Sequence, residues 1–216
     1  MMIEKKLFGS REEWLAARSG RIGGSDAAAI VGESPYMSNT ELWEIKAGTR
    51  LQKDISEEAH VKYGAEAEEH LRALFALDFP QYDVLYEPNN MWLNDRFPFA
   101  HASLDGWLVD QDGRKGILEI KTARPPMEKW KNQIPQHYFV QVLHCLMVTE
   151  FDFAIVKAQI KYDFSDNVDD IEAKTIHRLI ERSDFEADIE YLQSAERTFW
   201  KQLQVGKKPA LILPEI

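Results

Sequence analysis

Apolar residues recur at three- and four-residue spacing in several stretches of the chain, which predicts amphipathic helices there. Three of these helices begin at side chains that can cap a helix, namely Ser10 with Glu13, Ser25 alone, and Ser38 with Glu41. The predicted helices cover residues 10–19, 26–31, 38–48, 57–77 and 135–148. A long polar helix, in one piece or broken, is predicted over 169–205.

Short runs of β-branched and aromatic residues with two-residue alternation predict strands at 82–87, 91–94, 102–110, 116–123 and 153–160. The segment Asp110-Gln111-Asp112-Gly113 is a turn that makes a hairpin of the strands on either side. The order of helices, strands, helix, strand and helix predicts an α/β or α+β core with extra helices at both ends. A chain of 216 residues fits one domain over 1–216.

Composition narrows the class of protein. No apolar run reaches the roughly 18 residues that a membrane span needs, and residues 1–10 do not form a secretory signal. The single cysteine, Cys145, excludes a disulfide within the chain and fits a reducing cytoplasm. The net charge of −10 disfavours tight non-specific DNA binding. Residues 166–197 hold ten acidic and four basic residues, however, so the rest of the chain is only mildly acidic.

Charged residues that could carry chemistry lie in the predicted hairpin. Glu119 and Lys121 are two residues apart in a strand and therefore share one face, and Asp105 lies in the preceding strand. Two neighbouring carboxylates repel each other unless a cation lies between them, and Mg²⁺ or Mn²⁺ prefers such oxygen ligands. Gln141 falls on the helix face opposite the apolar one and can point at the same place. The alternative is a surface hairpin with exposed ion pairs.

Several blocks in a fixed order resemble the phage lambda exonuclease and YqaJ-like viral recombinase family, over about residues 14–160. The blocks are Trp14 through Arg18, Ile22-Gly23-Gly24-Ser25, Gly64 with Glu68 and Arg72-Ala73-Leu74-Phe75, Ser103 with Asp105-Gly106, Leu118-Glu119-Ile120-Lys121, and Gln141. The resemblance implies a PD-(D/E)XK nuclease with a restriction-endonuclease-like core, a central mixed sheet flanked by helices. It also implies 5′-to-3′ degradation of linear double-stranded DNA by a homotrimer, in a bacterial or phage-infected cell.

The resemblance also assigns roles to residues. Asp105 and Glu119 would bind Mg²⁺ or Mn²⁺, two ions per active site, with help from Glu68 and the carbonyl of Ile120. Lys121 would activate the water molecule and Gln141 would orient groups beside it. From its local sequence alone, Glu68 is one of several acids on a charged helix face.

A site for the 5′-terminal phosphate is predicted from Arg18, Ser25 and Ser103. Ser25 opens a short helix, whose free N–H groups favour an anion, and Arg18 can reach the same point. The residues alone equally fit a plain helix cap and a surface arginine, and the resemblance favours the phosphate site. A second basic residue of the family does not align cleanly, because Met127 falls at its position; Arg124 is a nearby substitute.

Two other functions remain open. One is a structure-specific endonuclease or nickase with the same core, because a fold does not fix a substrate. The other is a non-catalytic protein that binds DNA ends, which would not need two carboxylates beside a phosphate. The family further suggests that a single-strand annealing protein is a partner, acting on the 3′ overhangs that the exonuclease leaves.

Overall fold

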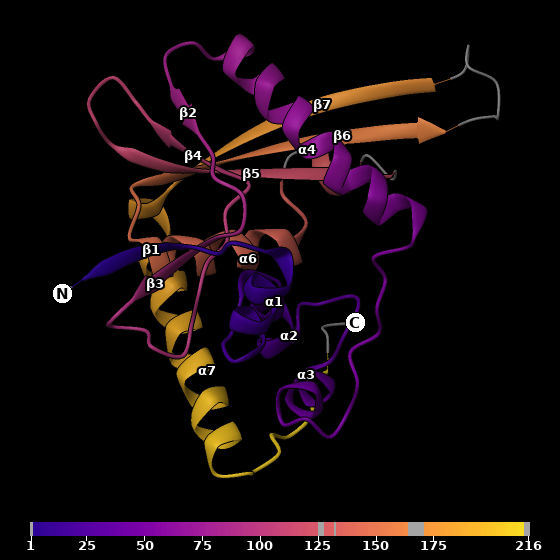
Figure 1. Cartoon of the computed structure of the whole chain (residues 1–216), viewed down its shortest axis with the longest axis vertical. Coiled ribbons are helices and arrows are strands. Elements are labelled where there is room, and N and C mark those ends of the chain that lie inside the picture. The colour runs from indigo at the N-terminus through magenta and orange to yellow at the C-terminus, as the bar shows by residue number, and fades with distance from the viewer. Residues whose placement is uncertain (1, 125–127, 132, 164–170, 214–216) are drawn as a thin grey trace.

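The computed structural model describes residues 2–124, 128–131, 133–163 and 171–213, and Figure 1 shows how the elements are arranged. The helices are α1 (Arg11–Ser19), α2 (Gly24–Ile30), α3 (Asn39–Lys46), α4 (Ala59–Asp78), α5 (Glu128–Lys131), α6 (Gln136–Thr149) and α7 (Glu186–Gln204), with a 3-10 turn η2 (Arg182–Phe185) before α7. The strands are β1 (Ile3–Leu7), β2 (Asp83–Leu85), β3 (Asn90–Asn94), β4 (Gly106–Val109), β5 (Lys115–Ala123), β6 (Phe153–Asp163) and β7 (Ile171–Glu181). No helix in the described ranges is long and apolar enough to cross a membrane.

A five-stranded sheet with the order β2-β4-β5-β6-β7 forms the centre of the molecule. Strands β5 and β6 are parallel, and each of the other neighbouring pairs is antiparallel. Parallel neighbours need a crossover connection, which α6 provides between β5 and β6. Helix α4 lies on one side of the sheet and α6 on the other (Figure 1). The predicted fold class, a central mixed sheet flanked by helices, is confirmed.

The two faces of the sheet carry separate hydrophobic clusters, because side chains alternate along each strand. Leu118 and Ile120 of β5 belong to a cluster that includes Phe75 of α4. Ile117 of β5 belongs to the larger cluster that includes the apolar face of α6. The charged residues of β5 at positions 119 and 121 alternate with the first pair and therefore lie on the α6 face, as their spacing predicts.

A two-stranded ribbon of β1 and β3 lies outside the central sheet. The sequence predicted the second of these strands but not the first. The ribbon packs on the sheet through aromatic contacts, since the rings of Trp92 and Trp107 meet edge to face with centroids 5.6 Å apart. The ammonium group of Lys5 lies 4.5 Å from the Trp107 ring, which adds a cation–π contact to this packing.

The long helix predicted over 169–205 is wrong in its first half. Strand β7 occupies part of this range and α7 begins only at Glu186, while residues 169 and 170 lie outside the described residues. Ile176 and Ile180 are buried, and a spacing of four puts two side chains on one face of a helix and also of a strand. Pairing with β6 along the whole of β7 decides between the two, and local spacing does not reveal that pairing.

Two elements, α2 and β4, begin at other residues than the sequence predicted. The cap of α2 is Gly23, whose N–H donates to the carboxylate of Asp26 at 3.0 Å, so Ser25 lies inside the first turn. A Cβ atom on Gly23 would stand 2.8 Å from the ring of His101, and only glycine fits there. The strand predicted over 102–110 is shorter, because β4 begins at Gly106.

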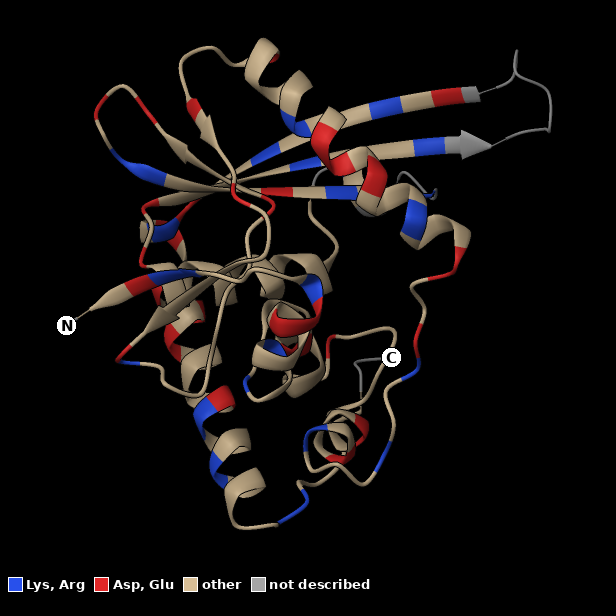
Figure 2. Cartoon of the chain, viewed as in Figure 1, with Lys and Arg blue, Asp and Glu red and all other residues tan. Residues whose placement is uncertain are grey.

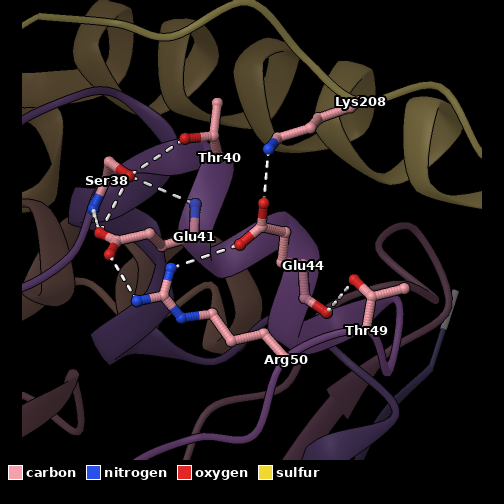
Figure 3. A network of polar contacts seen from close by, with 7 residues as sticks. All are labelled: Ser38, Thr40, Glu41, Glu44, Thr49, Arg50 and Lys208. Carbon is pink, nitrogen blue, oxygen red and sulfur yellow. Dashed lines mark hydrogen bonds and ion pairs between the residues drawn. The ribbon is translucent and has the colours of Figure 1, made fainter.

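The segment after α7 folds back onto α3, where Figure 3 shows a network of polar contacts. Asn39 is buried, donates to the carbonyl of Ala210 at 2.7 Å and accepts from the N–H of Ile212 at 3.0 Å. Lys208 forms an ion pair with Glu44 at 2.5 Å (Figure 3). These contacts attach the chain after α7 to the helices that precede the sheet.

Candidate active site

Strand β5 and the residue before β4 bring Asp105 and Glu119 together. The side chain of Glu119 is 1% exposed, although it is a carboxylate in an otherwise apolar part of the strand. Asp105 accepts a hydrogen bond from the N–H of Ile120 at 2.9 Å, which anchors its carboxylate on β5. Red and blue segments of β5 lie next to the red segments of α4 in Figure 2, so charges from two elements meet here.

Glu119, Lys121 and Gln141 form a closed triangle of polar contacts. The Nζ atom of Lys121 lies 2.7 Å from Glu119 Oε1, and Gln141 Nε2 donates to the same oxygen at 2.6 Å. Lys121 also donates to Gln141 Oε1 at 3.1 Å. Gln141 comes from α6, so the helix face opposite its apolar stripe does point at β5. The predicted group of Asp105, Glu119, Lys121 and Gln141 is therefore adjacent in the structure.

The second oxygen of Glu119, Oε2, is buried and has no hydrogen-bond partner. A buried carboxylate oxygen without a partner is costly, and a bound cation would satisfy it. The N–H and C=O of one strand residue leave toward the same side, so the Ile120 carbonyl is directed toward Asp105. The pairing of β4 with β5 ends at Leu118, so β4 does not cover that carbonyl.

These oxygens suit Mg²⁺, which needs only a few protein ligands, better than a metal ion whose ligands all come from the protein. In the described residues no three His, Cys, Asp or Glu side chains converge into a complete metal cage. Mg²⁺ commonly binds through one or two carboxylates and fills its remaining positions with water and substrate phosphate. Asp105, Glu119 and the Ile120 carbonyl supply that partial set.

The cluster is electrostatically strained without a cation. Burial raises the pKa of Glu119 to about 7; Lys121 opposes this and the Asp105 carboxylate adds to it. Burial also raises the pKa of Asp105, against the effect of Lys121. Burial alone would lower the pKa of Lys121, but the carboxylates of Glu119 and Asp105 raise it, so the amine stays charged.

Glu68 comes from α4, the helix on the opposite face of the sheet. Burial and, to a lesser degree, the charges of Asp105 and Glu119 raise its pKa to about 7. Helix α4 approaches β5 closely at Gly64, where a Cβ atom would stand 3.1 Å from Thr122 Oγ1. This close approach lies one turn before Glu68, which is near enough for the charges of Asp105 and Glu119 to act on it.

Arg72 is a residue of this site whose role the sequence did not reveal. One turn after Glu68 on α4, its guanidinium donates to the backbone carbonyl of Asp105. The same guanidinium lies 3.6 Å from the ring centroid of Tyr86, which fixes its position. Arg72 thus holds the backbone of a carboxylate-bearing residue rather than the carboxylate itself. Its position in a family block was a signal, but only the fold shows the contact.

Two of the residues predicted to bind a terminal phosphate, Arg18 and Ser103, have surroundings that suit this role. The guanidinium of Arg18 lies 4.1 Å from the Trp14 ring, and Asp105 is among the charges that act on it. Burial lowers the pKa of Arg18, although the carboxylate of Asp26 opposes this. Ser103 Oγ is buried and has no hydrogen-bond partner, so it is available to a ligand.

Two other predicted phosphate ligands are placed less directly. Ser25 is exposed in the first turn of α2, a helix of seven residues. The start of this helix packs closely on α6, since a Cβ atom on Gly24 would stand 3.0 Å from Cγ of Gln141. Arg124 is exposed and follows the last residue of β5, three positions beyond Lys121.

Comparison with known proteins gives matches in sequence and in structure. The sequence model described as "YqaJ-like viral recombinase domain" matches residues 13–152. The uncharacterized protein YqaJ of Bacillus subtilis (strain 168) is 31% identical over 214 residues, which is 97% of this chain and 62% of that protein. The chain therefore spans less than two thirds of this curated relative.

Two solved structures share the fold. The alkaline exonuclease LHK-Exo from Laribacter hongkongensis superposes with a TM-score of 0.61 at 22% identity, over 90% of this chain and 93% of that one. A phage-related exonuclease from Haemophilus somnus 129PT has a TM-score of 0.60 at 16% identity, over 86% and 96% of the two chains. At these identities the likeness establishes the arrangement of helices and strands.

Proposed function

Because this chain belongs to the YqaJ-like viral recombinase domain family, we propose that it is a metal-dependent deoxyribonuclease that uses the cluster around Glu119. The family resemblance stated from the sequence blocks is thereby confirmed. The observation that carries the proposal is the buried, unpartnered oxygen of Glu119 beside Asp105 and Lys121. A purely structural ion pair would not need a second carboxylate next to it.

In this proposal Asp105, Glu119 and the Ile120 carbonyl hold Mg²⁺ or Mn²⁺, and Glu68 supports a second ion. When bound, the cation supplies charge neutralisation at the phosphate and makes a bound water more acidic. Lys121 remains charged and stabilises the negative charge that develops on the phosphate. Gln141 keeps Lys121 and Glu119 in fixed positions by contacting both.

The proposed substrate is the 5′ end of linear double-stranded DNA, degraded 5′ to 3′ to leave a 3′ overhang for single-strand annealing recombination. Arg18 and Ser103 support this polarity, because a largely buried arginine on which the charge of Asp105 acts and a buried unpartnered hydroxyl suit a terminal phosphate. Ser25 and Arg124 would add contacts at its edge.

One experiment tests reaction and polarity together. Linear duplex labelled at either the 5′ or the 3′ end is incubated with Mg²⁺, and the released label is followed. We expect early release from the 5′ end and faster degradation of 5′-phosphate than of 5′-hydroxyl ends. Arg18→Ala should remove most of that preference, while Arg114→Ala, an exposed arginine on the β4–β5 turn, should keep it. A preference intact in Arg18→Ala would place the phosphate elsewhere.

The same cluster would also serve an endonuclease or nickase. Discrete cuts in circular duplex, in place of progressive loss of linear duplex alone, would favour that function. A non-catalytic DNA-end-binding protein would leave linear duplex intact in Mg²⁺. The adjacency of Asp105 and Glu119, whose charges also act on Glu68, favours catalysis over binding alone, because carboxylates repel a phosphate when no cation is present.

Assembly and partners are part of the proposal as well. We propose a homotrimer and an annealing protein that binds the exposed 3′ strand, both from the family resemblance. The mass of the protein in solution tests the first, and a stable monomer would contradict it. Co-purification of an annealing protein with the chain tests the second.

A further inference from the structure

Four aromatic side chains form a series of ring contacts that runs from the core to the solvent, and we call them the aromatic group. The ring centroids of Trp130 and Tyr138 are 5.6 Å apart, those of Tyr138 and His137 are 4.0 Å apart, and those of His137 and Tyr36 are 5.6 Å apart. Trp130 is buried, whereas Tyr36 is 78% exposed. The group therefore has an inner end and an open end.

The aromatic group touches the proposed active site in its middle. The Nζ atom of Lys121 lies 4.9 Å from the ring centroid of Tyr138. Tyr138 lies in the first turn of α6, three residues before Gln141, so the two side chains lie on neighbouring parts of one helix face. Burial raises the pKa of Tyr138 and the neighbouring Tyr36 phenol raises it further, which shows that the two phenols are close.

Exposure of one tyrosine does not by itself indicate a site, because single apolar side chains on a surface are common. The position of Tyr36 is what needs a reason. Tyr36 follows Pro35 in the loop between α2 and α3, and its ring contacts His137, whose ring contacts Tyr138 beside the lysine at the proposed site of cleavage. A nucleotide whose phosphate lies at Lys121 would have its base within reach of these rings.

We propose that Tyr36 and Tyr138 form a stacking platform for an unpaired base of the 5′-ended strand, next to the phosphodiester that is cut. This inference rests on the proposed nuclease function and names how the end of the duplex is held open. Aromatic rings bind bases of any sequence, because every base has a π-face. Stacking also does not depend on net charge, which suits a protein whose charge of −10 repels DNA overall.

A thermodynamic cycle that combines one change in the protein with one change in the DNA tests the contact between ring and base, with binding affinity as the measured quantity. The protein changes are Tyr36→Ala and Tyr36→Phe, made in the cleavage-deficient Asp105→Ala background so that the DNA stays intact. The DNA change removes the base at the first two nucleotides of the 5′-ended strand and leaves the backbone in place. Tyr191→Ala is the matched control, because Tyr191 is also an exposed tyrosine, at 66%, but lies on α7 and outside the series of ring contacts.

We expect the abasic end to bind about tenfold more weakly than the normal end in the Asp105→Ala parent and in its Tyr36→Phe variant, since stacking contributes at about this level per base. The Tyr36→Ala protein should bind both ends alike. The Tyr191→Ala protein should behave as the parent. The ratio should persist at higher salt while all affinities fall, because phosphate contacts depend on salt and stacking does not.

Two results would overturn the platform. One is an abasic penalty that stays the same in Tyr36→Ala. The other is a loss of affinity that depends on Tyr36 only when the base is removed from the opposite strand. Degradation of linear duplex by the unmodified protein is measured separately. Active degradation without coupling would refute the platform alone, whereas absent degradation would refute the nuclease function.

Discussion

Glu119 and Glu196 are the two almost completely buried glutamates in the described part of the chain, and their surroundings differ. Glu119 on β5 is bound by Gln141 of α6 at 2.6 Å, and Glu196 on α7 is bound by His144 of α6 at 2.7 Å. In both cases one oxygen is paired, while Oε2 is buried without a partner. By burial and hydrogen bonding alone the two could not be told apart.

They differ in the charges that surround them. Burial raises the pKa of Glu119 to about 7 against the effect of Lys121, and the carboxylate of Asp105 contributes to the rise. Glu196 faces one histidine, and that histidine also contacts the carbonyl of His101 at 2.9 Å. Burial lowers the pKa of His144, but Glu196 and the carbonyl of His101 together with the charge of Asp26 raise it, and the net result is a raised pKa. Both carboxylates are buried, so what distinguishes the candidate catalytic site is that a second carboxylate, Asp105, lies beside the buried Glu119.

The sharpest way to break this comparison is to remove each carboxylate charge in turn. Glu119→Gln should lower the rate of cleavage of linear duplex in Mg²⁺ by about three orders of magnitude or more, because a metal ligand is lost. Asp105→Ala and Lys121→Ala should do the same. Glu196→Gln is the matched control and should keep the rate per folded molecule. Near-normal turnover in Glu119→Gln would remove the active-site assignment.

For stability we expect the opposite: the change at Glu196 should lower the free energy of unfolding more than the change at Glu119. Glu196→Ala leaves His144 buried without its partner, and breaking such a pair costs about 3–5 kcal/mol in the free energy of unfolding. Glu119→Gln keeps the size of the side chain, leaves Lys121 the charge of Asp105 and removes like-charge repulsion, so it should cost less. Urea denaturation at neutral pH measures both. Equal losses in the two variants would mean that the clusters are energetically alike.

A change at Arg72 should have a smaller effect on the cleavage rate, because Arg72 acts on the cluster around Glu119 only through the backbone of Asp105. Arg72→Ala removes the hydrogen bond to the Asp105 carbonyl, and a displacement of about 1 Å at a catalytic group can cost about a hundredfold in rate. We expect a loss of about 10- to 100-fold in kcat, a higher Mg²⁺ requirement, weaker Mn²⁺ binding by calorimetry, and partial recovery in Arg72→Lys. An unchanged kcat with a raised KM for DNA would instead make Arg72 a DNA contact.

The part of the site that the sequence predicted depends on local periodicity. Alternation along one strand places Glu119 and Lys121 on one face, and helical spacing places Gln141 opposite the apolar stripe of α6. Both patterns need only a few neighbouring residues. The capping pair Ser38 and Glu41 is equally local and is also present in the structure.

What the sequence missed depends on pairing between distant segments. Strand β7 exists because it pairs with β6, and β1 because it pairs with β3. The contact of Arg72 with Asp105 joins residues 33 positions apart, and that of His144 with Glu196 joins residues 52 apart. Glu196 lies in the acidic segment 166–197. No local pattern marks which of its acids is buried.

The last prediction concerns pH and Mg²⁺, where the expected effects are smallest. The pKa of Glu119 and of Glu68 rises from 4.5 to about 7 on folding. Between these values the unfolded chain has released protons that the folded chain still holds, so stability falls as the pH rises from about 4.5 to 7. His144 has a raised pKa, so its contribution is present below 6.5 and is lost as the pH rises through its folded-state pKa.

Mg²⁺ separates the two contributions, because it can neutralise only the cluster around Glu119. In chelator, the melting temperature should fall between pH 5 and pH 8, by about 2–4 °C for each kcal/mol lost. Mg²⁺ at pH 8 should restore part of the fall in the unmodified protein and none in Glu119→Gln, and cleavage should increase as the pH passes about 7. The remaining fall belongs to His144 and should be insensitive to Mg²⁺. If Mg²⁺ raised the melting temperature of Glu119→Gln as much as that of the unmodified protein, the ion would bind elsewhere.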